Sequence, residues 1–96
     1  MTLLHLNNNS FTGTIPDSLK DLIALTELDL NNNQFSGPFP TIILQIPNLM
    51  YLDLRFNLFS GPIPDLVFTK NLDTILLNNN NFEGQIPQSL GNSHAR

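Results

Sequence analysis

One asparagine recurs along the whole chain at nearly constant spacing, and this period constrains the fold more than any other feature. Asn9, Asn33, Asn57 and Asn80 each follow a short alternation of apolar and polar residues, and successive members lie 24, 24 and 23 residues apart. A period of this length is typical of repeat proteins, in which each unit packs mainly against its two neighbours. The sequence therefore predicts a stack of similar coils.

Each asparagine belongs to a longer frame that returns in every repeat. The second repeat contains Leu25, Leu28, Leu30, Asn33, Phe35, Gly37, Phe39 and Pro40, and the third contains Leu49, Leu52, Leu54, Asn57, Phe59, Gly61, Ile63 and Pro64. The repeats span residues 1–24, 25–48, 49–71 and 72–96, and Met1 takes the place of the first opening leucine. This frame predicts an α/β-type solenoid of mostly strand and loop with little helix. We expect a right-handed superhelix of four leucine-rich repeats, with four parallel strands on the concave face.

The frame positions have separate structural roles. Alternation from Leu28 to Leu30 directs both leucines inward and Asp29 outward, as in a half-buried strand. The recurring asparagine has both donors and acceptors for turn amides that stacking removes from water, so we expect a ladder of Asn9, Asn33, Asn57 and Asn80. Two residues later a phenylalanine recurs, and these rings are expected to stack as a core spine: Phe11, Phe35, Phe59 and Phe82.

The composition limits the classes of partner. The chain has 96 residues, no cysteine and a net charge of -4, and its few cations, Lys20, Arg55, Lys70 and Arg96, are scattered. Nucleic acid is a poor partner because phosphate binding needs clustered Lys and Arg, so a basic protein or peptide fits better. No segment reads as a membrane span or a signal peptide. Neither end carries a recognisable cap, so we expect an excerpt of a longer solenoid that could self-associate end to end.

The groups that could form a catalytic or metal site are expected on the outward side of the strands. Asp29 and Asp53 are expected about 4.8 Å apart on neighbouring strands, with Glu27 beside them and His5 at the head of their column. A solvated column of carboxylates lacks the contrasting environments of a glycosidase pair, and it offers no supporting shell for a metal. We therefore predict no enzyme activity, no cofactor and no metal site.

The third repeat breaks the polar monotony of the outward columns, and this predicts the recognition face. Arg55 replaces the asparagine found at positions 7, 31 and 78, while Phe56 replaces the asparagine found at positions 8, 32 and 79. The predicted ligand-binding residues are Glu27, Asp29, Tyr51, Asp53, Arg55 and Phe56. Mixtures of aromatic, guanidinium and carboxylate groups are typical of binding hot spots. The alternative is structural: Arg55 neutralises Asp29 or Asp53, and Phe56 packs against the ladder.

One modification site is also predicted. Asn8, Asn9 and Ser10 form the one acceptor triplet for N-glycosylation in the chain, with Asn8 as the acceptor. Asparagine-rich repeats also produce such triplets by chance.

The frame LxxLxLxxNxFxGxIP, present from Leu25 to Pro40 and again from Leu49 to Pro64, resembles the plant-specific class of leucine-rich repeats. Within that class, four segments are similar to leucine-rich repeat extensins and their short secreted relatives. These are FSGPFP at 35–40, TIILQIPNL at 41–49, LDLRFN at 52–57 and FTKNLDTILLNNN at 68–80. The resemblance implies residence in the cell wall, binding of small basic cysteine-rich signalling peptides of the rapid alkalinisation type, and a partner domain elsewhere.

The chain departs from the extensins in two respects. It has no proline-rich tail, and it lacks the cysteines of their flanks. Receptor-kinase ectodomains and polygalacturonase inhibitors share the general frame and remain alternatives. A truncated repeat fragment with a structural role or no function is the remaining one.

Overall fold

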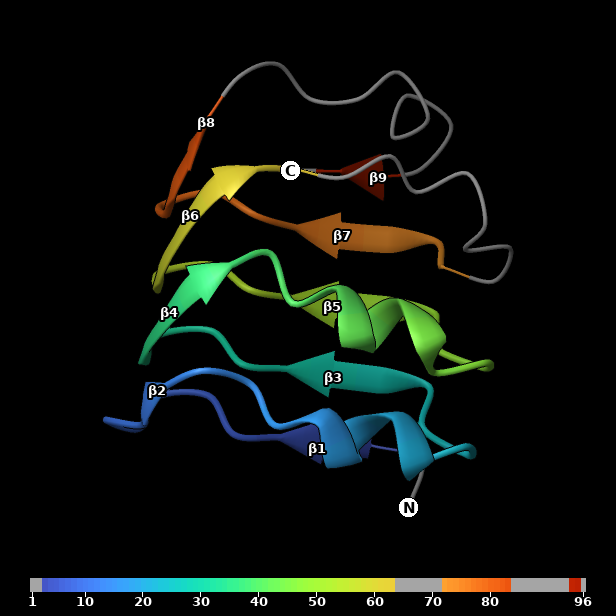
Figure 1. The fold of residues 1–96 in the computed structure, drawn as a ribbon. Coiled ribbons are helices and arrows are strands. Elements are labelled where there is room, and N and C mark those ends of the chain that lie inside the picture. The colour runs from blue at the N-terminus through green and yellow to red at the C-terminus, as the bar shows by residue number, and fades with distance from the viewer. Residues whose placement is uncertain (1–2, 64–71, 84–93, 96) are drawn as a thin grey trace.

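The computed structural model of the chain describes residues 3–63, 72–83 and 94–95. Its main feature is a parallel sheet with the strand order β1-β3-β5-β7-β9, to which each of the first three repeats contributes one short strand and the fourth contributes two (Figure 1). The strands are β1 (Leu3–His5), β3 (Glu27–Asp29), β5 (Tyr51–Asp53), β7 (Thr74–Leu76) and β9 (His94–Ala95). The sequence predicted four strands here, and β9 is a fifth. The leucine-rich repeat solenoid is confirmed.

A second parallel sheet follows the turn, and the sequence analysis did not predict it. Its order is β2-β4-β6-β8, and its strands are β2 (Thr12–Gly13), β4 (Gln34–Pro38), β6 (Leu58–Pro62) and β8 (Asn81–Glu83). Prolines at the ends of β4 and β6 and a glycine with positive φ before each of them disguise these strands, because both residue types are rare in strand interiors. Gly37 has φ 92°, a value that favours glycine over any other residue.

The return side of the coils contains two short 3-10 helices. They are η1 (Asp17–Asp21) in the first repeat and η2 (Thr41–Gln45) in the second. They are stacked like the strands, one coil apart (Figure 1). Among the described residues, no helix is long and apolar enough to cross a membrane.

The leucines of the frame form one continuous core between these layers. Leu28 and Leu52 are adjacent in the parallel register and are both fully buried, as are Leu25 and Leu54. Alternation along each three-residue strand sends these side chains inward and leaves their neighbours outward. The inward prediction is therefore confirmed for the second and third repeats.

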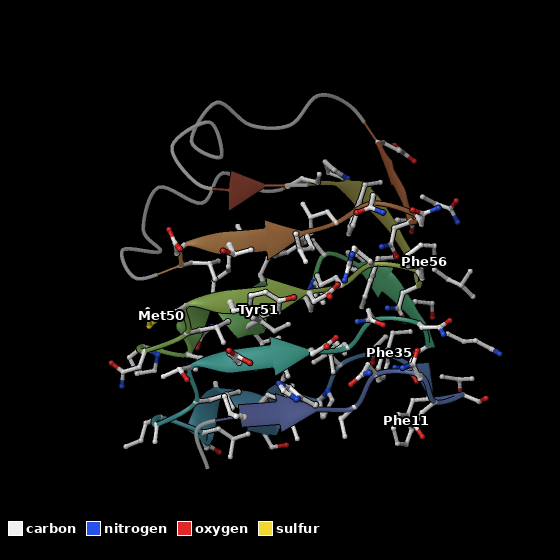
Figure 2. The ribbon with its side chains drawn as sticks, turned by 180° about the vertical axis from the view of Figure 1, so that it is seen from behind. Phe11, Phe35, Met50, Tyr51 and Phe56 are labelled. Carbon is white, nitrogen blue, oxygen red and sulfur yellow. The ribbon has the colours of Figure 1, made fainter. Side chains whose placement is uncertain are left out.

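The phenylalanine spine is present across four coils. Phe11 stacks on Phe35, Phe35 on Phe59 and Phe59 on Phe82, with ring centroids 6.2, 6.4 and 6.2 Å apart. Phe59 is fully buried and Phe35 nearly so, but Phe11 is 45% exposed. The prediction that all four rings are core is thus wrong for Phe11, which stacks on one ring and on one side only (Figure 2).

The asparagine ladder joins each coil to the one before it. The Asn57 amide nitrogen donates to the Leu30 carbonyl of the preceding coil at 2.9 Å, and its Oδ1 accepts the Phe35 amide at 3.1 Å. Asn33 and Asn80 make the same pair of bonds one coil earlier and one coil later. Among the described residues, Asn9 donates within its own turn, to the carbonyls of Leu6 and Asn7. The predicted ladder is confirmed for three joints.

Candidate ligand-binding face

The outward side of the five-stranded sheet, here called the strand face, presents the predicted binding residues in columns set by the parallel register. Glu27 lies beside Tyr51, and His5, Asp29 and Asp53 form the next column. The column of His5 above the two aspartates is as predicted. Parallel neighbours share a face and have side chains close enough to interact, so this register positions the site.

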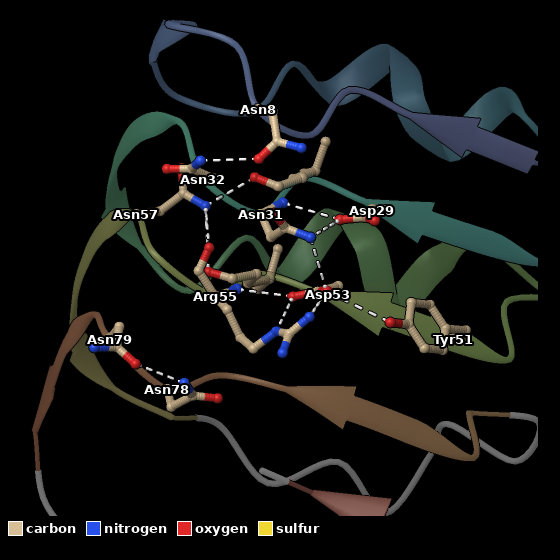
Figure 3. Close-up of polar contacts among 12 residues, drawn as sticks. Asn8, Asp29, Asn31, Asn32, Tyr51, Asp53, Arg55, Asn57, Asn78 and Asn79 are labelled. Carbon is tan, nitrogen blue, oxygen red and sulfur yellow. Dashed lines mark hydrogen bonds and ion pairs between the residues drawn. The ribbon is translucent and has the colours of Figure 1, made fainter.

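Asp53 is the centre of the polar contacts on this face (Figure 3). Its Oδ1 accepts from Arg55 Nε at 2.9 Å and from the Arg55 backbone amide at 3.1 Å, while its Oδ2 accepts from Arg55 Nη2 at 2.7 Å. Asn31 on the neighbouring coil donates to Oδ2 at 3.1 Å, and the Tyr51 hydroxyl approaches it at 3.4 Å. A two-point contact between a guanidinium and a carboxylate is both strong and directional.

Burial distinguishes Asp53 from the solvated column that the sequence predicted. The Asp53 side chain is 0% exposed and that of Arg55 is 35% exposed, so the guanidinium covers the carboxylate. The expectation of a fully wet acidic column is therefore wrong at this position. The physical reason is the arginine two residues later, which replaces the asparagine of the other repeats and is long enough to fold back over the strand.

The ionisation of these groups follows from the same contacts. Burial alone would raise the pKa of Asp53, but the hydrogen bonds from Arg55 and Asn31 outweigh it, and the pKa lies below its ordinary value. Burial and the nearby carboxylates of Asp53 and Asp29 raise the pKa of Tyr51. The hydrogen bond to Asp53 raises the pKa of Arg55. All three groups keep their usual charge at neutral pH.

Asp29 occupies the equivalent position one coil earlier but has a different partner. Asn31 donates to its Oδ1 twice, from the backbone amide at 3.1 Å and from the side-chain amide at 2.7 Å (Figure 3). Within the described part of the chain, no bond to Asp29 Oδ2 is formed. The Asp29 carboxylate is only partly buried and therefore remains accessible to a ligand.

His5 and Glu27 form an exposed pair at the edge of the same face. His5 Nε2 lies 3.0 Å from Glu27 Oε2, with side-chain exposures of 47% and 41%. Across residues 3–63 and 72–83, no group of three or more histidine, aspartate or glutamate side chains is arranged to hold a metal ion.

A fixed backbone conformation explains why asparagine dominates the turn after each strand. Asn8, Asn32, Phe56 and Asn79 have φ values of 61°, 58°, 57° and 64°. This left-handed region suits asparagine among the non-glycine residues, and it costs most other L-residues about 1 kcal/mol or more. Phe56 therefore has a backbone conformation that is unfavourable for its bulky side chain.

Phe56 is also about half exposed, whereas the structural alternative for this residue was packing against the ladder. Its side chain is 49% exposed, and Leu58, two residues later, is 51% exposed. The equivalent positions in the second repeat are Asn32 and Gln34, so an apolar pair replaces a polar one. Leu58 was not predicted as part of the site, although its apolar character at a polar column position was a usable signal.

The predicted residues do not form a single cluster. Tyr51 lies on strand β5 whereas Phe56 lies in the turn beyond it, and the two are well separated in Figure 2. Five residues of chain separate them, which corresponds to at most about 17 Å. Glu27, Asp29, Asp53 and Arg55 group with Tyr51 on the strand face. Asn31, which bonds to both aspartates, was named in the sequence analysis only as a column position.

Comparisons with known proteins agree with this architecture. A leucine-rich repeat family model matches residues 1–59, and a second leucine-rich repeat model matches residues 71–93. No match was found among curated protein sequences.

Solved structures similar to the chain include ectodomains of plant receptor kinases. The leucine-rich repeat ectodomain of the receptor kinase SOBIR1 from Arabidopsis thaliana has a TM-score of 0.84 at 32% identity, over 100% of this chain and 53% of that one. The Arabidopsis receptor kinase HAESA, in complex with the peptide hormone IDA and the co-receptor SERK1, has a TM-score of 0.86 at 36% identity, over 95% and 15%. The BIR3–SERK2 complex from Arabidopsis thaliana gives 0.82 at 30% identity, over 99% and 55%.

The repeated coil, the inward ladder and the open strand face define a leucine-rich repeat solenoid. The chain belongs to the leucine-rich repeat family, since the family model covers more than half of it. It spans about half of the SOBIR1 ectodomain and a much smaller part of the HAESA one.

Proposed function

We propose that the chain is a protein or peptide recognition module whose strand face binds an extended polypeptide. The observation that carries this proposal is the third repeat, which places Arg55 and an exposed Phe56 in columns that hold asparagine in the other repeats, and Tyr51 on the strand before them. Phe56 has a backbone conformation unfavourable to it and gains little burial in return. Such strain persists in proteins mainly where it serves a function.

The distance between the two aromatic side chains supports a polypeptide over a small molecule. A ligand that contacts both Tyr51 and Phe56 must reach across the strand and its following turn (Figure 2). Several extended residues span such a distance, whereas a compact metabolite does not. Aromatic anchors of this kind contribute strongly to peptide affinity.

The partner is proposed to be a small basic signalling peptide outside the cell. The net charge of -4 and the carboxylates of the strand face favour a cationic ligand. The similarity to receptor ectodomains, among them HAESA with a peptide hormone, supports an extracellular setting and recognition in place of catalysis. Cell-wall residence of the kind found in leucine-rich repeat extensins is the finer part of the proposal, and it rests on the resemblance of 35–40, 41–49, 52–57 and 68–80 alone.

A receptor-kinase ectodomain is the second candidate context. Its support is the similarity to the ectodomain of the receptor kinase SOBIR1 and to the BIR3–SERK2 complex. In that context the chain is one part of a longer solenoid, and the strand face has the same role. Polygalacturonase-inhibitor-like function and a purely structural fragment have no observation that favours them.

Binding measurements with short synthetic peptides of basic, neutral and acidic composition test the proposed function. We expect a basic peptide to bind, and Tyr51→Ala and Phe56→Ala each to weaken it by about 2 kcal/mol, roughly 30-fold. Ile23→Ala is the control, because Ile23 is 65% exposed and precedes the strand. If both aromatic variants lower the melting temperature yet bind as tightly as the wild-type chain, the binding face lies elsewhere.

Glycosylation of Asn8 is proposed for the secreted form. Its side chain is exposed at the turn, where its Oδ1 accepts a hydrogen bond from Asn32 at 2.8 Å. Treatment of secreted protein with a glycosidase that removes N-linked glycans should lower its mass, and Asn8→Gln should abolish that change. An unchanged mass after treatment contradicts the assignment.

A further inference from the structure

The two aspartates of the strand face differ in the residue that follows them by two positions. Asn31 contacts Asp29 through Oδ1 only, whereas Arg55 contacts both oxygens of Asp53 and covers them. The backbone contact is the same in both, from the amide two residues later at 3.1 Å. The side chain two residues after each aspartate, Asn31 or Arg55, therefore determines whether the carboxylate of that aspartate is accessible.

The carboxylates of the strand face differ in the groups that contact them. Arg55 pairs with Asp53, and Glu27 contacts His5, which is cationic only when protonated. Asp29 accepts only from the neutral side chain and backbone of Asn31. Within strands β1, β3, β5 and β7, Asp29 is thus the carboxylate that contacts neither an arginine nor a histidine, and its Oδ2 accepts no bond.

Tyr51 lies near the Asp29 carboxylate, on the neighbouring strand. Glu27 and Tyr51 are paired in the register, and Asp29 is paired with Asp53. The effect of Asp29 on the ionisation of Tyr51 also indicates their proximity. An apolar or aromatic surface beside an uncompensated carboxylate matches the stem and head of a long cationic side chain.

We propose that the strand face binds a polypeptide through a lysine or arginine side chain that pairs with Asp29, and that Asp53 is a positioning residue without direct ligand contact. Asn31 and Arg55 are the specificity-determining pair, since each sets the access to its own aspartate. This inference rests on the proposed function and assigns the charge contact within it. Asp53 holds Arg55, Asn31 and Tyr51 in place from beneath the surface.

Nuclear magnetic resonance titration with a defined probe tests this assignment residue by residue. The probe is an acetylated and amidated tetrapeptide of alternating lysine and leucine, and its counterpart carries glutamine in place of lysine. The backbone amides of Asn31 and Arg55 are the reporters, because they donate to Asp29 and Asp53 respectively. We expect the lysine probe to shift the Asn31 amide in preference to the Arg55 amide, and the glutamine probe to bind more weakly.

Three variants separate the cation contact from general charge effects. Asp29→Asn should weaken the lysine probe about fivefold without changing the glutamine probe or the melting temperature. Asn31→Arg should have at least the same effect, because the new guanidinium covers Asp29 as Arg55 covers Asp53. Asn78→Arg is the charge-matched control: it adds the same charge to the same column, but Leu76 stands where the aspartate would be.

The outcomes distinguish this inference from the function on which it rests. If the lysine probe binds equally well to the wild-type chain and to Asp29→Asn, the cation contact is wrong even when Tyr51→Ala still weakens binding. Equal weakening by Asn31→Arg and Asn78→Arg also overturns it, because general repulsion then explains both. If neither Tyr51→Ala nor Asp29→Asn affects any peptide, the proposed function fails as well.

Discussion

The inward and outward columns of the same strands differ in how strictly they repeat. Inward positions keep leucine or isoleucine, the ladder asparagine and the spine phenylalanine from one repeat to the next. Outward positions change identity between neighbouring coils, as at Asn31 and Arg55 or at Asn32 and Phe56. Burial explains the contrast, because a close-packed interior restricts side-chain volume while a sheet surface does not. The outward variation is therefore where one such chain can differ in partner from another.

The largest expected effect is at the spine. Phe59→Ala should lower the free energy of unfolding by about 4 kcal/mol, since its ring is fully buried between two other rings. Phe11→Ala is the control and should cost clearly less, because Phe11 is 45% exposed. Urea denaturation measures both. Equal losses would mean that burial does not distinguish these two rings.

The second-largest expected loss of stability is at the asparagine ladder. Asn57→Ala removes the side-chain acceptor of the Phe35 amide and one of the two asparagine donors to the buried Leu30 carbonyl, which keeps Asn33, so we expect a loss of about 2 kcal/mol by the same measurement. Asn32→Ala is the matched change on the outward side, where one exposed bond to Asn8 is lost. A loss at Asn32 as large as that at Asn57 would contradict the inward–outward distinction.

Asp53 lies at an outward position of its strand, but its side chain is buried like that of an inward residue. Asp53→Asn should cost about 2 kcal/mol at neutral pH, because it weakens the charged bonds to Arg55. The pKa of Asp53 is lower in the folded chain than in the unfolded one, so its contribution is full above the unfolded value of about 3.9 and is lost as the pH falls through the folded value. Thermal unfolding of both chains across acid pH should show the difference shrinking below about pH 4. A gap that persists at lower pH would show that the carboxylate charge is not its source.

The smallest expected effect has the opposite sign. Phe56→Asn should raise stability by about 1 kcal/mol, because asparagine tolerates the left-handed conformation that Phe56 adopts at φ 57°. It should also weaken peptide binding if Phe56 is an anchor. The melting temperature and a binding measurement on the same preparation check both. A destabilised variant would show that Phe56 contributes to packing.

The difference between inward and outward positions also determines how much of the fold could be predicted from the sequence alone. The period, the ladder and the spine follow from inward residues whose identity is dictated by stacking, and all three are present in the structure. The second sheet was missed because its strands contain glycine and proline, which normally interrupt strands. Glycine and proline are compatible with the second sheet because each of its strands is short and pairs with the equivalent segment of the neighbouring repeats.

The site was predicted only in part. The repeat spacing placed Asp29 beside Asp53 and His5 at the head of their column correctly. It could not show that Arg55 would choose Asp53 over Asp29, because that depends on how a long flexible side chain folds over the strand. The exposure of Phe56 was likewise undetermined, since a turn position can direct its side chain to either side.

The ladder also gives the stack a direction. Asn33, Asn57 and Asn80 each bond to a carbonyl and an amide of the coil before them: Asn33 reaches Leu6 and Phe11, and Asn80 reaches Leu54 and Phe59. When a coil unfolds at the C-terminal end of the stack, the preceding coil loses the asparagine that bonds to its backbone. When a coil unfolds at the N-terminal end, the following coil loses only the partners of its asparagine side chain. Fraying should therefore be asymmetric along the axis, and the exchange of the phenylalanine amides with solvent records it joint by joint.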